Sequence, residues 1–506
     1  MSPKPLIAAV DCGTSAVKAA VLDDRGRALA VADRAVPCRH FPDGRVEQDA
    51  RQLKAAAFRV LRQVLAAGPD YARRVAAVAV TNQRATVVCT GADGEPLAPA
   101  LSWQDMRGSP ELARVRRELD DRAYFHLTGL PNHPVFSLAK ILCVRRRQPE
   151  LYRKTARFVL LHDFLARALG CDDFYTDVSN ASLTGLMDLR TQRWSRPLLE
   201  LSGVPEGKLP IIVAPGQPIG RVSRTAARRS GLPEGTPIIA GGGDQQCAGL
   251  GAGVTEPGVC SITLGTASVV FCQTSRPVLD PRRRVTCCAH ALPGRWCLEG
   301  LQNTAGDAVN WAARQLAGAR GLTPAFWRKV AAVPPGARGV IFLPYLAGAA
   351  APHWRAEATG MWLGLRRSHD PACLMRAVLE GVAVDNRRIL DVLAGLRIPV
   401  REIRLTGGFA KYPVWNQLQA DLYGRKILTL KNAQATLLGV AMLGAWGAGL
   451  VSSLEDAARR MVRTETFFLP DAARQARYEM LYRHQNRLFN VINGGAVFSL
   501  LDAGIH

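Results

Sequence analysis

The sequence of 506 residues lacks any uncharged apolar run of about 18 residues, so we expect no membrane-spanning helix. Residues 1–9 also lack the long apolar region and the small-residue cleavage site of a secretory signal. Cysteine is sparse: the twelve cysteines include no C-x-x-C pair, which excludes a disulfide-rich scaffold and zinc-like spacing. We therefore expect a cytoplasmic protein whose cysteines are reduced thiols that pack as small apolar residues.

Three motifs of common enzyme classes are also missing. The chain has no Walker-A pattern G-x-x-x-x-G-K-[ST] and no Rossmann pattern G-x-G-x-x-G after its first predicted strand. It has no G-x-S-x-G serine elbow, so hydrolase chemistry has little support. Any phosphate-binding site must therefore be of another type.

Acidic residues are in deficit, which leaves a net charge of +23 and a pI near 10.1. A basic protein attracts phosphates, including those of nucleic acids. The excess, however, is mostly arginine spread along the chain, with no basic tail, zinc-finger spacing or aromatic-rich RNA-binding motif. We expect no nucleic-acid partner, and interpret the charge as a composition bias that favours small anions such as nucleotides.

Apolar runs alternate with helical patterns along the first half of the chain. The pattern predicts helices at 49–65 and 135–147, and the runs predict strands at 6–10, 17–22, 75–81, 158–161 and 237–240. Strands that alternate with helices are typical of an α/β domain, and the length allows two to four domains of about 100–200 residues.

The opening pattern returns in the second half. Residues 241–244, Gly-Gly-Gly-Asp, lead from a strand into a predicted small-residue helix, 247–253, and strands 259–264 and 269–273 follow. The turns of the two predicted hairpins share Gly-Thr, at Gly13-Thr14 and Gly265-Thr266. We interpret this as a loose internal duplication and predict two related lobes, 1–250 and 251–506. The second lobe adds a predicted strand at 402–406 and helices at 413–422 and 433–448; the role of 490–506 stays open.

Two of the glycine turns carry residues suited to phosphate chemistry. The first turn places Asp11 before Thr14 and Ser15, with Lys18 just beyond, so metal positioning and phosphate contact are both served there; a plain hairpin turn is the alternative. Asp244 follows three glycines and is a candidate general base for phosphoryl transfer. The alternative for Asp244 is a simple helix N-cap.

Taken together, these segments resemble the FGGY family of carbohydrate kinases, in the actin-like ATPase superfamily, along essentially the whole chain. The matching segments, in family order, are 11–18, 81–84, 102–105, 177–182, 241–246, 264–267, 300–311, 360–364 and 405–424. The resemblance implies an α/β fold of two actin-like (ribonuclease H-like) lobes, each a mixed sheet flanked by helices, with an interdomain cleft. It implies that lobe 1–250 binds the sugar and carries the base, and that lobe 251–506 binds the nucleotide.

The resemblance also implies roles for individual residues. Asp244 corresponds to the catalytic base, with Gln245 beside it on the substrate, and Asp11 lies near Mg²⁺. Arg84 matches a substrate-contacting position, and Trp103 is a candidate substrate wall or a core aromatic. The residues expected to contact ATP are Thr14, Ser15, Lys18, Thr266, Gly306, Asn310, Gly407 and Gly408.

The substrate is less well defined than the reaction. Ala85 stands where glycerol kinases have Glu, and Val135 stands where they have a substrate-facing Tyr. Losing both hydroxyl partners disfavours glycerol, because a buried hydroxyl without a partner costs roughly 1–3 kcal/mol. We expect ATP- and Mg²⁺-dependent phosphorylation of a ketopentose such as xylulose. Glycerol or another polyol, and a catalytically silent sugar- or nucleotide-binding regulator, stay open as alternatives, as does a homodimer.

Overall fold

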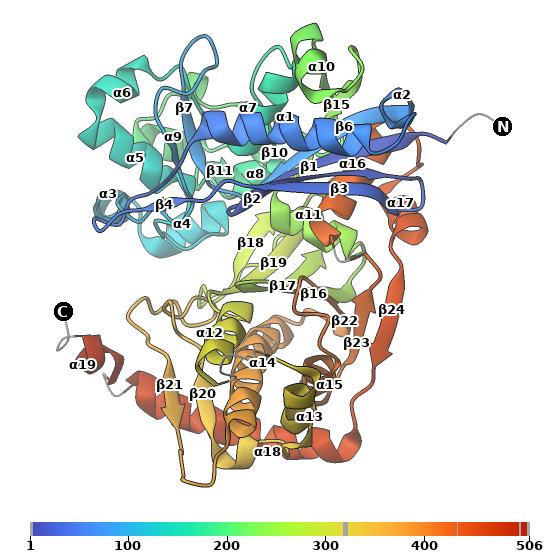
Figure 1. The fold of residues 1–506 in the computed structure, drawn as a ribbon. Helices are drawn as coiled ribbons and strands as arrows, with labels where there is room; N and C mark the ends of the chain where they lie inside the picture. The colour runs from blue at the N-terminus through green and yellow to red at the C-terminus, as the bar shows by residue number, and fades with distance from the viewer. Residues whose placement is uncertain (1–3, 317–321, 433, 495–496, 503–506) are drawn as a thin grey trace. The chain divides into compact units, whose positions relative to one another are not determined.

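The computed structural model describes residues 4–316, 322–432, 434–494 and 497–502. The chain forms two compact units: unit 1 contains residues 1–255, 273–297 and 434–462, and unit 2 contains 256–272, 298–433 and 463–506. The chain thus passes from one unit to the other near residue 255, and two later segments return to unit 1. Figure 1 shows the course of the chain and the labels used below.

Unit 1 consists mainly of the first half of the chain. Its principal elements are β1 (Leu6–Cys12), β2 (Ala16–Leu22), β3 (Ala28–Ala35), β4 (Arg39–His40), β5 (Val46–Gln48), α1 (Ala50–Ala66), α2 (Tyr71–Arg74), β6 (Val75–Asn82), β7 (Val87–Thr90), β8 (Ala100–Leu101), α3 (Ser109–Glu118), α4 (Asp121–Thr128), α5 (Ser137–Arg147), α6 (Pro149–Lys154), β9 (Arg157–Leu160), α7 (Leu161–Leu169), β10 (Tyr175–Asp177), α8 (Val178–Ser182), β11 (Met187–Asp188), β12 (Arg193–Trp194), α9 (Arg196–Ser202), β13 (Ile211–Val213), β14 (Pro218–Arg221), α10 (Arg224–Ser230), β15 (Pro237–Ile239), α11 (Asp244–Gly251), β18 (Thr286–Ala289), α16 (Ala435–Gly447) and α17 (Leu454–Met461).

Unit 2 begins with the second hairpin. Its elements are β16 (Gly258–Leu264), β17 (Ser268–Thr274), β19 (Trp296–Gln302), α12 (Gly306–Leu316), α13 (Pro324–Ala332), β20 (Ile341–Leu343), β21 (Met361–Leu363), α14 (Pro371–Gly395), β22 (Val400–Thr406), α15 (Pro413–Tyr423), β23 (Lys426–Leu430), β24 (Thr464–Phe468), α18 (Ala472–Gly494) and α19 (Val497–Asp502).

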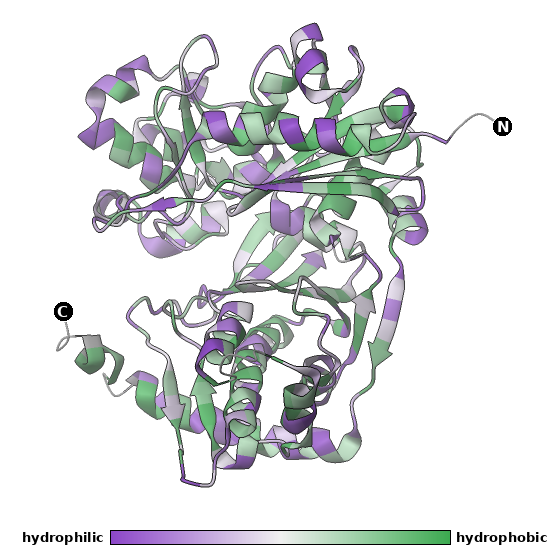
Figure 2. Ribbon diagram, in the orientation of Figure 1, coloured by the Kyte–Doolittle hydropathy of each residue, from purple (hydrophilic) through white to green (hydrophobic). Residues whose placement is uncertain are grey.

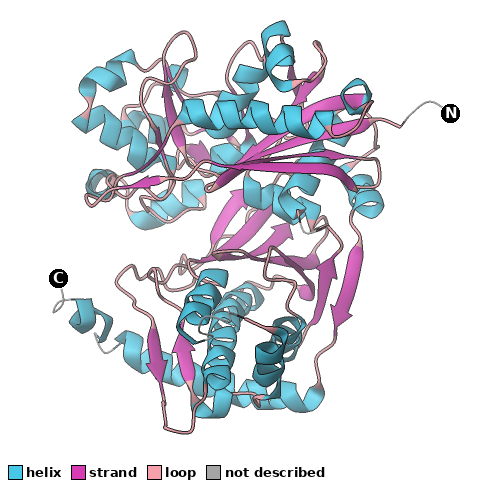
Figure 3. Ribbon diagram, in the orientation of Figure 1, coloured by secondary structure: helices cyan, strands magenta, loops and turns pink. Residues whose placement is uncertain are grey.

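The central sheets of the two units share one topology. In unit 1 the strand order is β14-β15-β6-β1-β2-β3, and in the other, seven-stranded sheet it is β24-β23-β22-β16-β17-β19-β18, of which the first six strands correspond. In each sheet the hairpin, β1–β2 or β16–β17, is antiparallel. Its first strand begins a parallel run, β1-β6-β15 or β16-β22-β23, and the edge strand after this run, β14 or β24, is antiparallel. Both are mixed sheets among helices, as Figure 3 shows, so the predicted fold class and duplication are confirmed.

The core of unit 1 is a sheet covered by helices on both faces. Alternate residues of β1 face opposite sides: Leu6, Ala8 and Val10 pack with α1 and α7, whereas Ile7 and Ala9 pack with α11, α16 and α17. Helix α1 is capped by Asp49, buries one apolar face and exposes a polar one, which Figure 2 shows as alternating green and purple patches. The strand ends of unit 1 are thereby held by a rigid core.

Helices α11 and α16 approach each other closely through glycine. A Cβ at Gly251 would lie 1.9 Å from the Ala435 carbonyl oxygen, and one at Gly439 would lie 1.8 Å from that of Cys247. The predicted helix at 433–448 is therefore a packing helix that begins at Ala435; Ala433 lies outside the described residues. Within the described ranges, no helix has both the length and the hydropathy to cross a bilayer.

Several predicted boundaries were wrong. Helix α11 begins at Asp244 rather than Cys247, α5 begins at Ser137, and Leu161 belongs to α7 instead of the preceding strand. In the last stretch, Phe489, Ile492 and Phe498 are buried against Tyr345, so α18 and α19 pack onto unit 2.

The expectation of reduced cysteines is also wrong for one pair. Cys260 and Cys272 face each other in the β16–β17 register and form a disulfide, with their Cα atoms 4.6 Å apart. The short cross-strand distance brings the two thiols within bonding reach. The other ten cysteines are reduced thiols, and nine of them are buried.

Candidate active site

In unit 1 the turn between β1 and β2 carries the first predicted phosphate residues. Gly13 N–H donates to the Ala16 carbonyl at 3.1 Å, which closes the turn. Two glutamines hold its backbone from other elements: Gln48 Nε2 donates to the Thr14 carbonyl at 2.7 Å, and Gln83 N–H donates to the Cys12 carbonyl at 2.9 Å. The turn that presents Thr14 and Ser15 is therefore fixed by the surrounding chain.

Asp11, at the end of β1, is suited to a cation. Its Oδ1 is buried and has no hydrogen-bond partner within the described part of the chain. Burial and then the nearby charge of Asp244 raise the pKa of Asp11 to about 7, and Lys18, its register partner on β2, acts in the opposite direction. An unsatisfied buried carboxylate oxygen near a second carboxylate fits a hard cation such as Mg²⁺.

This arrangement does not make a complete metal site by itself. Over the residues that the structure describes, no three His, Cys, Asp or Glu side chains cluster so as to hold a metal ion. Mg²⁺ is commonly held by one or two carboxylates together with substrate phosphates, so Asp11 fits that mode of binding.

Asp244 is the first residue of α11, directly after the Gly241–Gly243 turn. Its Oδ1 accepts from Arg84 Nε at 3.1 Å and from the Gln245 backbone N–H at 2.8 Å. Arg84 Nη1 also donates to Gln246 Oε1 at 3.2 Å. The predicted base and the predicted substrate arginine are thus in direct contact. Asp244 is not the N-cap of α11, because Gly243 occupies that position and Asp244 lies in the first helical turn.

Position 243 must be glycine because the side chain of Arg84 passes close to its Cα. A Cβ at this position would lie 2.4 Å from Arg84 Cδ, so a larger residue would displace the arginine. The glycine therefore allows the guanidinium stem to cross the turn and reach Asp244.

Three buried side chains from other elements hold the turn before Asp244. His162 Nε2 accepts from Gly241 N–H at 3.2 Å, Thr81 Oγ1 donates to the Gly242 carbonyl at 2.6 Å, and Ser179 Oγ accepts from Gly243 N–H at 2.9 Å. Ser179 in turn donates to Asp177, and His162 Nδ1 lies 3.0 Å from Asp163 Oδ1. This scaffold fixes where the carboxylate of Asp244 lies.

Trp103 connects a predicted substrate wall to the phosphate turn. Its indole N–H donates to the hydroxyl of Thr14 at 3.0 Å, and its backbone N–H donates to Thr86 Oγ1 at 3.1 Å. The side chain is half-buried rather than part of the core. Unit 1 therefore gathers Asp11, Thr14, Arg84, Trp103 and Asp244 into one constellation, with Lys18 and Gln245 beside it.

In unit 2 the turn between β16 and β17 carries Thr266, whose side chain is exposed. Gly306 N–H donates to the Gly265 carbonyl at 2.9 Å, and Ala305 N–H donates to the Thr266 carbonyl at 2.8 Å. A Cβ at Gly306 would lie 2.4 Å from the Gly265 carbonyl oxygen, and one at Gly407 would lie 2.4 Å from the Leu264 carbonyl oxygen. Because neither residue has a Cβ, the backbone at Gly306 and at Gly407 lies close to the β16–β17 turn.

Three of the five nucleotide residues predicted in unit 2 therefore come together around the β16–β17 turn: Thr266, Gly306 and Gly407. Gly408 follows Gly407 in the chain. Asn310 lies four residues after Gly306 on α12, on the same side of the helix, and is exposed. Glycine turns that bring backbone N–H groups close to the surface, beside an exposed hydroxyl, fit the phosphates of a nucleotide.

Sequence reasoning missed the residues that hold the turns. Gln48, Thr81, Gln83, His162 and Ser179 are each buried, and each contacts the backbone of β1 and its turn or of the turn before Asp244. The spacing of Ser179 two residues after Asp177 signals a capped helix start, which could have identified one of them. The other contacts join segments far apart in sequence, so no local pattern reveals them.

Comparison with known proteins gives the family. The N-terminal domain of the FGGY family of carbohydrate kinases matches residues 6–251, and its C-terminal domain matches residues 260–448. The chain is 28% identical to a xylulose kinase of Bacillus subtilis, over 94% of each chain. It is 33% identical to a glycerol kinase of Myxococcus xanthus, over 93% of this chain and 96% of the relative.

A solved structure gives the same result. A gluconate kinase from Lactobacillus acidophilus superimposes with a TM-score of 0.90 at 25% identity, covering 97% of this chain and 99% of that chain. Because both family domains and relatives of nearly full length match, the chain belongs to the FGGY family of carbohydrate kinases.

Proposed function

We propose that this chain transfers the γ-phosphoryl group of ATP to a hydroxyl of a small sugar or polyol, with Asp244 as the general base. The observation that carries the proposal is the Asp244–Arg84 contact on a turn fixed by three buried side chains. Phosphoryl transfer relies on positioning and on a residue that accepts the attacking hydroxyl's proton. A rigid turn with an oriented carboxylate meets both needs.

Each residue has a proposed part in this reaction. Arg84 and Gln245 orient the acceptor and the carboxylate, while Asp244 accepts the proton as the hydroxyl attacks. Thr14, Ser15 and Lys18 contact phosphate oxygens, and the proposed nucleotide contacts are Thr266, Gly306, Asn310, Gly407 and Gly408. Asp11 would hold Mg²⁺, which when bound neutralises phosphate charge.

The acceptor that we propose first is a ketopentose such as xylulose. Ala85 is almost fully buried and Val135 is half-buried, and neither side chain can hydrogen-bond a hydroxyl at positions where glycerol kinases have Glu and Tyr. Glycerol, another polyol or a sugar acid is the alternative, because relatives named for xylulose, glycerol and gluconate are all similar to this chain. A cytoplasmic location stays a prediction from the sequence.

The experiment is ADP release from Mg-ATP against a panel of ketopentoses, hexoses, sugar acids, glycerol and other polyols. We expect strong stimulation by one compound, which would also identify the substrate. If ATP binds but no compound stimulates release, the silent-regulator alternative replaces the kinase proposal. If ATP is hydrolysed at the same rate with and without every compound, the proposed acceptor class is wrong.

A further inference from the structure

Lys140, on α5, is a buried lysine that the proposed reaction does not use. Its side chain has no exposed surface, and its Nζ donates to three backbone carbonyls: Pro134 at 2.7 Å, Val135 at 2.9 Å and Trp103 at 3.2 Å. Among the described residues it has no carboxylate within ion-pair distance. Burying a charged group without a paired charge costs free energy, which the three charge-assisted hydrogen bonds of this ammonium offset. We therefore ask what the buried lysine contributes to the site.

The three carbonyls belong to two segments of the proposed acceptor site. Trp103 is the residue whose indole donates to Thr14, beside the phosphate turn. Val135 occupies the position where glycerol kinases have a substrate-facing tyrosine, and its backbone N–H donates to His133 Nδ1 at 3.3 Å. The ammonium of Lys140 is therefore a single anchor shared by two segments, and Trp103 and Pro134 are 31 residues apart in the sequence.

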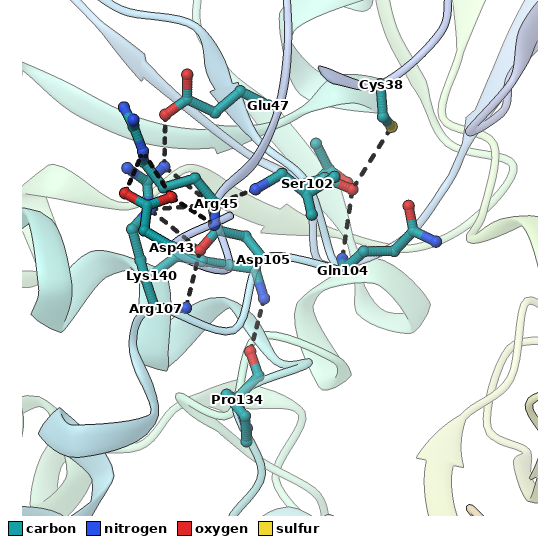
Figure 4. A network of polar contacts seen from close by, with 12 residues as sticks. Cys38, Asp43, Arg45, Glu47, Ser102, Gln104, Asp105, Arg107, Pro134 and Lys140 are labelled. Atoms are coloured by element: carbon teal, nitrogen blue, oxygen red, sulfur yellow. Dashed lines mark hydrogen bonds and ion pairs between the residues drawn. The ribbon is translucent and has the colours of Figure 1, made fainter. Parts of the chain in front are cut away.

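The neighbouring charges do not replace this anchor. Asp105 accepts from Val46 N–H at 3.0 Å and pairs with Arg107, and Arg107 Nη2 also pairs with Glu47 at 2.8 Å. Figure 4 shows this cluster beside Lys140 and Pro134. The carboxylate of Asp105 is engaged by Arg107, and the hydrogen bonds of the Lys140 ammonium go to backbone carbonyls of the two acceptor segments.

We propose that Lys140 is a positioning residue for the acceptor, whose three hydrogen bonds set the distance between the Trp103 segment and the Pro134–Val135 segment. This inference rests on the proposed function, since it assigns these segments to the acceptor. Lys140 itself does not touch the reacting atoms. Its effect on turnover comes through the width and rigidity of the site, which determine how tightly one acceptor is held relative to another.

The protonation state of Lys140 is consistent with this role. Burial lowers its pKa to about 7; Asp105 opposes the shift and Arg107 contributes to it. His133, in the loop before α5, is the other titratable group facing it, and burial lowers the pKa of His133 to about 4. An ammonium has three donors for three carbonyls, whereas the neutral amine has two. Loss of the proton therefore removes one of the three contacts.

The test compares Lys140→Met with Lys154→Met in the full-length protein. Methionine has a similar length and no donor, and Lys154 is an exposed lysine at the end of α6. We expect K140M to raise the KM for the acceptor by roughly tenfold or more, with the KM for ATP within about twofold of wild type. K154M should match wild type in both constants, and K140R should recover part of the loss.

The outcomes separate this inference from the proposed function. An unchanged acceptor KM in folded K140M, or an equal rise of both KM values, overturns the positioning role while the kinase assignment stands. Absence of turnover in the wild type with every acceptor overturns the proposed function instead. If K140M does not fold, the inference is tested by measuring the acceptor KM of the wild type from pH 6 to pH 9. A several-fold rise above about pH 7 with a constant KM for ATP supports the inference, and a flat profile overturns it.

Discussion

Arg84 donates its Nε–H to Oδ1 of Asp244 at 3.1 Å, and its aliphatic stem crosses Gly243, the residue just before Asp244. The arginine comes from the loop after β6 and the aspartate from the start of α11, so two segments 160 residues apart build one charged pair. The side chain of Arg84 is 13% exposed and that of Asp244 is 27% exposed. Both side chains are partly buried and still accessible, which the proposed role of Asp244 as the general base requires.

The first prediction concerns this base. Asp244→Asn keeps the size of the side chain but cannot accept the proton of the attacking hydroxyl. We expect turnover to fall by about 10²–10⁴-fold, with the thermal midpoint and ATP affinity close to wild type. Turnover is measured with the best acceptor of the panel, and ATP affinity by calorimetry. Asp33→Asn, at an exposed position on β3, is the matched control; near-normal turnover of D244N would show that another group is the base.

The second prediction concerns the Trp103–Thr14 hydrogen bond. Trp103→Phe keeps an aromatic wall but removes the indole donor, so the Thr14 hydroxyl loses this partner. A neutral hydrogen bond contributes about 0.5–1.5 kcal/mol, so we expect kcat/KM for the acceptor to fall roughly twofold to tenfold. Trp194→Phe is the control, because it removes an indole hydrogen bond of the same kind, to the Pro210 carbonyl at 3.0 Å. Equal effects of the two variants would contradict a specific role for Trp103.

The third prediction tests the scaffold behind Asp244. Ser179→Ala removes the acceptor for the buried Gly243 N–H, which we expect to cost about 1–3 kcal/mol of unfolding free energy and to lower kcat. Ser182→Ala, on the same short helix, removes a buried hydroxyl that donates to the Ser179 carbonyl at 2.8 Å. Urea unfolding should show destabilisation in both variants, whereas steady-state kinetics should show a loss of kcat in S179A only. A kcat of S179A equal to that of S182A would make Ser179 a general stability residue.

The sequence allowed the fold to be predicted because the two hairpins and their Gly-Thr turns are local patterns. Residues 6–22 and 258–274 each supply two apolar strands and a tight turn, and the duplicated sheet follows from them. The start of α11 was missed because three glycines precede Asp244, and glycine is a poor helix former. The structure ends the glycine turn at Gly243 and begins the helix with the acidic residue, which the helix dipole favours.

The contacts that complete the site could not be predicted in the same way. Lys140 follows an apolar pattern on α5 as a single lysine, and only the folded chain brings the Trp103 and Val135 carbonyls to it. The Cys260–Cys272 disulfide was not predicted because its cysteines are 12 residues apart, outside the short C-x-x-C spacing. Pairing the predicted strands about the Gly265–Ala267 turn nevertheless sets them opposite each other. The identity of the acceptor depends on a few side chains such as Ala85 and Val135. These apolar residues remove hydrogen-bond partners that glycerol would need, but they do not specify one sugar.

The fourth prediction is a pH dependence of stability from Asp11. Its pKa is raised from 3.8 to about 7, first by burial and then by Asp244, so between these values the folded state holds a proton that the unfolded chain has lost. The free energy of unfolding due to this carboxyl therefore falls as pH rises from about 4 to about 7. Urea unfolding without Mg²⁺ should show a smaller loss of stability between pH 5 and pH 8 in Asp11→Asn than in wild type. Identical pH slopes in the two proteins would contradict the assignment.

The same experiment tests the proposed metal role of Asp11. Mg²⁺ binds the ionised carboxylate, so Mg²⁺ with ATP should flatten the pH slope of the wild type by stabilising the charged form. The D11N variant should respond much less to Mg²⁺ at a fixed ATP concentration. A full Mg²⁺ response in D11N would mean that the metal is held elsewhere.

The fifth prediction concerns the β16–β17 turn of unit 2, which we propose contacts the nucleotide. In Gly306→Ala the new Cβ would lie 2.4 Å from the Gly265 carbonyl oxygen and 2.1 Å from Phe409 Cε2, so the β16–β17 turn and α12 must move apart. We expect the KM for ATP to rise roughly tenfold with a smaller change for the acceptor, because the displaced residues include Thr266 and the start of α12. Gly395→Ala is the matched control, since a Cβ there meets no atom within 4 Å. If G306A and G395A bind ATP equally well, the proposed nucleotide site around this turn is wrong, and a selective rise of the acceptor KM in G306A would assign the turn to the sugar instead.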